Sequence, residues 1–256
     1  MTIASSVAFA VDVDPLRLEL TIPADQPSRS TLTITNSGAK TVNVNVRPAP
    51  YRFWQTDSTR PPSAETWFTF EPSGALTLAP GASQKITCIV TPPPTLQKDA
   101  HAEYVAALLI DELPAEEEQP SEKGAQITVV PRFALPVYLQ IQGRQQVLAE
   151  ISRFEIHAAA SGGLLRADIE LQNKGTIHLR PLGTILFFHQ TSDVVVRASP
   201  VGKALPIFPA TGLQIPVVVP MPSPGHYKAV VTLNLGQNKI LQKEAAFEVL
   251  QDGTVH

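Results

Sequence analysis

The side chains that most often carry out catalysis are few and scattered in this chain of 256 residues. The single cysteine, Cys88, excludes a disulfide within the chain and a metal site built from cysteines. No two of the six histidines have the close spacing typical of an obvious metal site: His101, His157, His178, His189, His226 and His256. A G-x-S-x-G motif, a P-loop and a dinucleotide fingerprint are also missing. We therefore expect neither an enzyme nor a cofactor or metal site.

One side chain has the chemistry of binding rather than of catalysis. Arg17 lies between Leu16 and Leu18, whose apolar side chains we expect to face a core. Its guanidinium should then point away from the core, where it can form a bidentate hydrogen bond with a carboxylate.

An acidic segment and a long strand-like segment follow one another in the first half. The residues Pro114–Gly124, PAEEEQPSEKG, have no apolar anchor, so we expect a mobile, solvated loop there. The next segment, Ala125–Ile141, is long for a sandwich strand, and its prolines Pro131 and Pro136 favour an edge or bulged strand. Three apolar residues share one of its faces: Ala125, Ile127 and Val129. An edge strand with spare apolar side chains can be lent to another protein's sheet.

The elements that must position these residues are predicted to be strands. Apolar and polar residues alternate with period two in many segments, for example Leu16–Ile22, Val42–Arg47, Leu165–Gln172 and Tyr227–Leu235. Half-buried antiparallel strands explain this alternation, and no capped helix stands out. Cys88 falls on the apolar face of one such strand, where we expect a buried, unreactive thiol.

Two parts of the chain repeat the same pattern at the spacing of a whole domain. Each has a strand, an Asn-x-Gly turn and a further strand, with the turns at Asn36–Gly38 and Asn173–Gly175. We therefore predict an all-β protein of two tandem immunoglobulin-like sandwiches. The expected domains are 11–142 and 147–250, joined by the short polar segment Gly143–Gln146, with a frayed tail at 251–256.

Composition narrows the partners and the location. The net charge is −3 without a basic stripe, so nucleic acid is not expected as a partner. No apolar run is long enough to insert in a membrane. We interpret residues 1–10, which end in Ala8-Phe9-Ala10, as the remnant of a signal peptide, with an ordinary mobile terminus as the alternative. That interpretation predicts export to the periplasm.

The chain resembles the PapD-like periplasmic pilus (fimbrial) chaperones over nearly its whole length, Val11 to Leu250. Three segments carry the resemblance: DPLRLEL from Asp14, AEYVAALLIDELP from Ala102 and RFALPVYL from Arg132. The last has the Leu-Pro-Val form of the archaic branch. The resemblance implies two immunoglobulin-like sandwiches in a boomerang arrangement. It also implies pilus or fimbrial subunits and an outer-membrane usher as partners.

The mechanism implied by the resemblance is donor-strand complementation. A pilus subunit lacks its last strand, and the chaperone inserts alternate apolar residues into the groove left open. By this likeness the donor residues are Ala125, Ile127 and Val129, and Arg17 matches the arginine that holds the carboxylate at the subunit's C-terminus.

Two positions depart from the family pattern. Ala134 stands where the family has a second, lysine ligand for the carboxylate, and we expect Arg132, two residues earlier, to substitute for it. Tyr138 stands in place of an arginine whose ion network includes the residue matched by Glu103. Two other functions remain open at this point: a structural or adhesive protein of the cell envelope, and an enzyme or small-ligand binder on the same scaffold.

Overall fold

The structure is a computed structural model that describes residues 10–51, 61–113, 131–160, 162–190, 195–202 and 205–256. The chain divides into two compact units, of which the first ends at Arg144 and the second runs from Gln145 to His256. This division falls inside the polar Gly143–Gln146 segment. In the described ranges there is no α-helix, and no helix has the length and apolar character needed to cross a membrane. The predicted all-β fold is confirmed.

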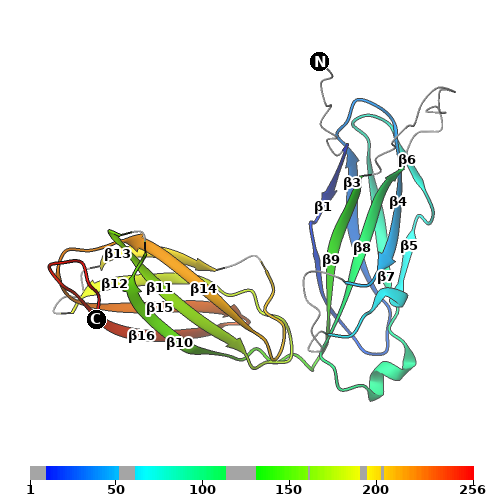
Figure 1. The fold of residues 1–256 in the computed structure, drawn as a ribbon. Coiled ribbons are helices and arrows are strands. Elements are labelled where there is room, and N and C mark those ends of the chain that lie inside the picture. The colour runs from blue at the N-terminus through cyan, green and yellow to red at the C-terminus, as the bar shows by residue number, and fades with distance from the viewer. Residues whose placement is uncertain (1–9, 52–60, 114–130, 161, 191–194, 203–204) are drawn as a thin grey trace, which may run out of the picture. The chain divides into compact units, whose positions relative to one another are not determined.

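The first unit is a sandwich of two sheets (Figure 1). The four-stranded sheet has the order β1 (Val11–Asp14), β3 (Ser28–Asn36), β7 (Ser83–Val90) and β5 (Phe68–Glu71). The five-stranded sheet has the order β2 (Leu18–Ile22), β9 (Arg132–Ile141), β8 (Glu103–Leu113), β4 (Val42–Ala49) and β6 (Leu76–Leu78). Two short 3-10 helices, η1 (Glu65–Trp67) and η2 (Pro94–Lys98), lie in the connections.

The core of the first unit follows from the period-two alternation. One face of each strand is buried, as for Leu135, Val137, Leu139 and Ile141 of β9, and the alternate residues lie on the outer face. Cys88 of β7 is fully buried, as predicted, and burial raises the pKa of its thiol to about 12. The thiol is therefore protonated and unreactive at neutral pH.

One expected core residue is exposed because the chain changes sheets. Leu16 was placed on the same face as Leu18, but it is 66% exposed, whereas Leu18 is buried. The reason is that β1 pairs with β3 in one sheet and β2 pairs with β9 in the other, so residues 15–17 form the connection between the sheets. Pro15, which has no N–H group, cannot continue the ladder of β1.

The second unit is a smaller sandwich of seven strands, the size of an immunoglobulin domain (Figure 1). Its three-stranded sheet has the order β10 (Ala149–Ala158), β11 (Leu164–Asn173) and β14 (Gly212–Pro220). Its four-stranded sheet has the order β13 (Val195–Gly202), β12 (Leu182–His189), β15 (Gly225–Gly236) and β16 (Lys239–Val249).

The repeated asparagines, Asn36 and Asn173, make equivalent hydrogen bonds in the two units. Asn36 ends β3, and its buried side-chain amide donates to the backbone oxygens of Lys40 and Leu78 at 2.8 and 2.9 Å. Its Oδ1 accepts from the N–H of Gly38 at 2.9 Å. Each Asn-x-Gly segment therefore connects one sheet to the other and is tied to a distant loop by an amide that solvent does not reach.

The second unit repeats this arrangement at Asn173. Its amide donates to the backbone oxygens of Ile177 and Ile207 at 2.9 and 2.7 Å, and its Oδ1 accepts from Gly175 at 2.8 Å. Gly175 must be a glycine, because a Cβ there would lie 2.2 Å from the backbone oxygen of Gln146. The sequence repeat is thus a repeat of contacts as well as of residue types.

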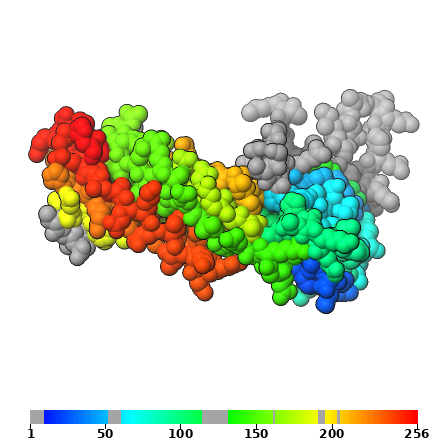
Figure 2. Space-filling model, turned by 90° about the horizontal axis from the view of Figure 1, so that it is seen from below, coloured from blue at the N-terminus to red at the C-terminus, as the bar shows by residue number. Residues whose placement is uncertain are grey.

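The C-terminal residues form a turn rather than the frayed tail that the sequence suggested. The backbones of Glu248 and His256 exchange two hydrogen bonds, of 2.8 and 3.0 Å, so the chain folds back on the end of β16. Gly253, at φ +82°, supplies the left-handed residue of the turn. Figure 2 shows these last residues, in red, packed together with the orange-red end of β16.

Candidate functional site

Of the residues singled out in the sequence, Arg132 begins β9 of the five-stranded sheet and Arg17 directly precedes β2 of the same sheet. Here β8 and β9 are paired antiparallel, residue for residue, without a bulge in the described part. The pairing sets Arg132 beside Asp111, Ala134 beside Leu109 and Pro136 beside Ala107: a small apolar floor with a charged end.

Further along this face, the side chains are buried. Tyr138, Val105 and Glu103 are each no more than 3% exposed. The hydroxyl groups of Tyr138 and Tyr51 lie 2.9 Å apart, and their rings meet edge to face. The Tyr138 hydroxyl thus has a partner of its own in the buried part of this face.

Arg17 directly precedes β2 and is half-exposed. Its Nε lies 2.8 Å from Oε1 of Glu19, two residues on. Exposed pairs of this kind contribute little to stability, so the guanidinium can exchange Glu19 for another carboxylate at small cost. Leu18, the next residue, pairs with Val137 of β9, which places Arg17 level with Pro136.

Arg132 is the first residue of β9, and it binds Asp111 rather than lying beside Arg17. Its Nε donates to Oδ1 of Asp111, while the Nε of Arg47, on β4, donates to Oδ2 of the same carboxylate at 2.9 Å. Burial raises the pKa of the Asp111 carboxyl, but the hydrogen bonds and charges of the two guanidinium groups outweigh it, and the net shift is downward.

The two predicted carboxylate ligands are therefore at different places on the face. Four residues of β9 separate Arg132 from the level of Arg17, about 13 Å along an extended strand. Arg47 was not among the predicted site residues. Its position in the alternation of Val42–Arg47 put it on the polar face, but the register that brings β4 to Asp111 is a long-range pairing.

The strand β9 is an edge strand for part of its length. Its residues Val137–Ile141 are central, between β2 and β8. Before Val137, its residues Arg132–Pro136 pair with β8 on one side, and no described strand pairs on the other. The edge prediction is thus wrong for the second half of β9, and it stays a prediction for the first half. The expected donor residues, Ala125, Ile127 and Val129, lie outside the described residues.

Asp111 should stabilise the first unit in a pH-dependent way. Because the pKa of its folded-state carboxyl is lowered, this stabilisation is present above the unfolded value of about 3.9 and is lost as pH falls through the folded value. We expect Asp111→Asn to lower the free energy of unfolding by about 1–3 kcal/mol near neutral pH. The deficit should shrink as the pH is lowered from about 5 towards 2.

Urea unfolding followed by tryptophan fluorescence measures this, because both tryptophans, Trp54 and Trp67, lie in the first half of the chain. The matched control is Glu71→Gln, which removes an exposed carboxylate bound by Arg29 at 3.0 Å and should change stability by less than about 1 kcal/mol. A deficit in Asp111→Asn that is the same at pH 5 and at pH 2 would contradict the assignment.

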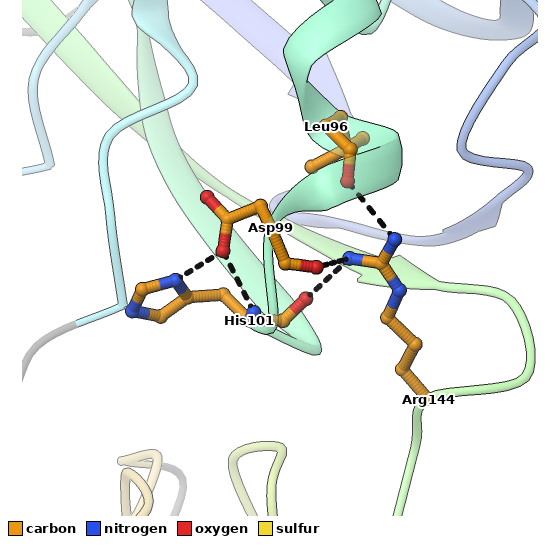
Figure 3. Close-up of polar contacts among 4 residues, drawn as sticks. All are labelled: Leu96, Asp99, His101 and Arg144. Carbon is orange, nitrogen blue, oxygen red and sulfur yellow. Dashed lines mark hydrogen bonds and ion pairs between the residues drawn. The ribbon is translucent and has the colours of Figure 1, made fainter.

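Arg144, in the predicted joint, caps a backbone loop of the first unit (Figure 3). Its guanidinium donates to three backbone oxygens, those of Leu96, Asp99 and His101, at 2.9, 2.7 and 3.1 Å. The Asp99 carboxylate in turn accepts from the backbone N–H of His101 at 2.9 Å. The last residue of the first unit is thereby attached to the connection between β7 and β8.

No group of three or more metal-ligating side chains occurs among the described residues. No protein-family model matches the chain, and no curated protein sequence matches it.

Several solved structures have a similar chain path. One is the class 5 fimbriae chaperone CfaA, at 12% identity and a TM-score of 0.48, over 91% of this chain and 98% of that one. Another is the E. coli chaperone DraB, at 16% and 0.45, over 93% and 98%. A third is from the CsuC–CsuE chaperone–tip adhesion subunit complex of Acinetobacter baumannii, at 14% and 0.45, over 91% and 97%. This similarity is one of chain path, and the function is argued from the residues.

Proposed function

We propose that the chain is a periplasmic chaperone that captures pilus or surface-fibre subunits by lending them a strand. The observation that carries the proposal is that Arg132–Pro136 of β9, a few residues after Ala125–Val129, pair with β8 on one side and with no strand of the described residues on the other. Backbone groups on the open side of a strand can form a ladder with an incoming strand, and alternate apolar side chains supply the specificity. No group on this face needs to do chemistry for such a function.

Two further features support the proposal. Arg17, next to β2 of the same sheet, offers a weakly paired guanidinium suited to a carboxylate of the client. The sequence segments beginning at Asp14, Ala102 and Arg132 resemble those of the PapD-like chaperones, and all three lie on or next to this sheet. Delivery to an outer-membrane usher and location in the periplasm belong to the proposal by the same resemblance.

The test is the double variant Ile127→Asp and Val129→Asp. Each Ile or Val side chain that enters a client groove should contribute roughly 1.5–3 kcal/mol. We therefore expect a folded, soluble protein that has lost at least about a hundredfold of its affinity for the subunit that co-purifies with the wild-type chain. Co-purification from the periplasm measures how much subunit the chain retains, and mass spectrometry identifies that subunit. Circular dichroism shows whether the variant is folded.

A matched control carries the same two kinds of change on the second unit, Leu182→Asp and Ile240→Asp, at side chains 64% and 72% exposed. It should bind the subunit like the wild type. Unfolding of the Ile127 and Val129 variant would show that these side chains belong to a core, and a folded variant that still holds its subunit would refute the donor strand.

A further inference from the structure

The carboxylate of Asp111 is bound by two arginines, and each of them uses only the Nε–H of its guanidinium group. Arg47 and Arg132 each contribute their Nε, one to each oxygen of the carboxylate. Asp111 is 9% exposed, whereas the side chains of Arg47 and Arg132 are 43% and 53% exposed. The carboxylate is thus covered by two guanidinium groups that themselves remain open to solvent.

The unused donors of these arginines belong to two strands that flank β8 on either side. A guanidinium has five N–H groups, of which the Nε–H is one, and within the described part of the chain no acceptor is assigned to the Nη atoms of Arg47 or Arg132. Two positive charges around one negative charge leave one positive charge in excess. Two other exposed arginines of this unit, Arg17 and Arg29, each bind one glutamate, Glu19 and Glu71 respectively.

The surroundings strengthen attraction to an anion. Leu109, level with Arg47 on one side and Ala134 on the other, provides a half-buried apolar floor beside the guanidinium groups. Charge–charge attraction is larger next to such surface than in open water. Because Asp111 already holds both Nε atoms, little side-chain entropy remains to be lost when an anion binds.

We propose that Arg47 and Arg132, each bound to one oxygen of Asp111, form a carboxylate-binding site separate from Arg17. A polypeptide partner offers carboxylates at its C-terminus and on its acidic side chains, and either fits the two forks of donors. That the partner is a polypeptide rests on the proposed function. The binding of a carboxylate by the two arginines does not. The outer face then holds two anion sites about 13 Å apart along β9.

The test uses the full chain and three short peptides in place of a client. One is acetyl-trialanine with a free C-terminal carboxylate, the second is acetyl-Ala-Glu-Ala-amide, and the third is acetyl-trialanine-amide, which has no charge. The arginine Nε–H signals are followed by NMR at constant chloride. We expect at least one charged peptide to shift the Arg47 and Arg132 signals with one common dissociation constant, and the uncharged peptide to shift neither. Which charged peptide binds more tightly identifies the source of the carboxylate.

Variants make the outcome decisive. Arg47→Met leaves Arg132 and Asp111 balanced in charge, so binding should weaken by about fivefold or more. Arg47→Lys keeps the charge and should retain part of the binding, and Arg29→Met should leave it unchanged. Equal shifts at Arg29 and Arg47, unchanged binding in Arg47→Met, or no shift with either charged peptide would overturn the site. Because no client is present, these results are independent of the Ile127 and Val129 experiment.

Discussion

Replacing Asn36 by alanine should lower the free energy of unfolding of the first unit by about 2–4 kcal/mol. The change removes two donated hydrogen bonds and one accepted bond from a side chain with no exposed surface. The backbone oxygen of Leu78 then loses its donor in a buried place, and that of Lys40 in a partly buried one. Asn173→Ala should have a similar effect on the second unit, because Asn173 makes the same three contacts.

The variant Asn36→Asp tests whether the two hydrogen bonds donated by the amide cause this stabilisation. Aspartate keeps the acceptor for Gly38 and would serve a simple turn, but it sets a carboxylate against two carbonyl oxygens. We expect it to destabilise the first unit at least as much as alanine does. The control is Asn234→Ala, since Asn234 accepts from Gly236 at 2.8 Å in an exposed turn. Urea unfolding, followed by tryptophan fluorescence for Asn36 and by hydrogen exchange for Asn173, measures each unit. A stable Asn36→Asp variant would show that only the turn matters.

The second large effect is expected at Arg144. Arg144→Ala removes a charged donor from three backbone oxygens, and we expect a loss of about 2–3 kcal/mol in the first unit. Arg144→Lys should recover less than half of this, because an ammonium group cannot reproduce the planar fork that reaches all three oxygens. Tryptophan fluorescence again reports the unfolding of this unit.

Hydrogen exchange locates the Arg144 effect. Amides from Leu96, in η2, to Glu103, at the start of β8, should lose more protection than those of β7. The control is Arg29→Ala, an exposed arginine that binds one carboxylate and should change stability by less than about 1 kcal/mol. Full recovery by lysine would mean that charge alone, and not the fork, holds the loop.

The architecture could be read from local patterns. Period-two alternation depends on which face of a strand is buried, and this is encoded within a few residues, so the all-β class and the burial of Cys88 were predictable. The Asn-x-Gly repeats predicted two related units for the same reason. Local patterns failed where the chain changes direction between sheets: Leu16 has the spacing of a core residue, but Pro15–Arg17 is the connection from β1 to β2.

The site depended on the tertiary structure. Arg17 and Arg132 could be selected from the sequence as exposed guanidinium groups, but their separation along β9 follows from the parallel pairing of β2 with β9. Arg47 and Asp111 belong to strands far apart in the chain, and they meet because β4 pairs with β8 in one particular register. That register is set by packing of both sheets around one core. Residue type and parity along the chain therefore determine which side chains face outward, and only the folded sheet determines which of them share a carboxylate.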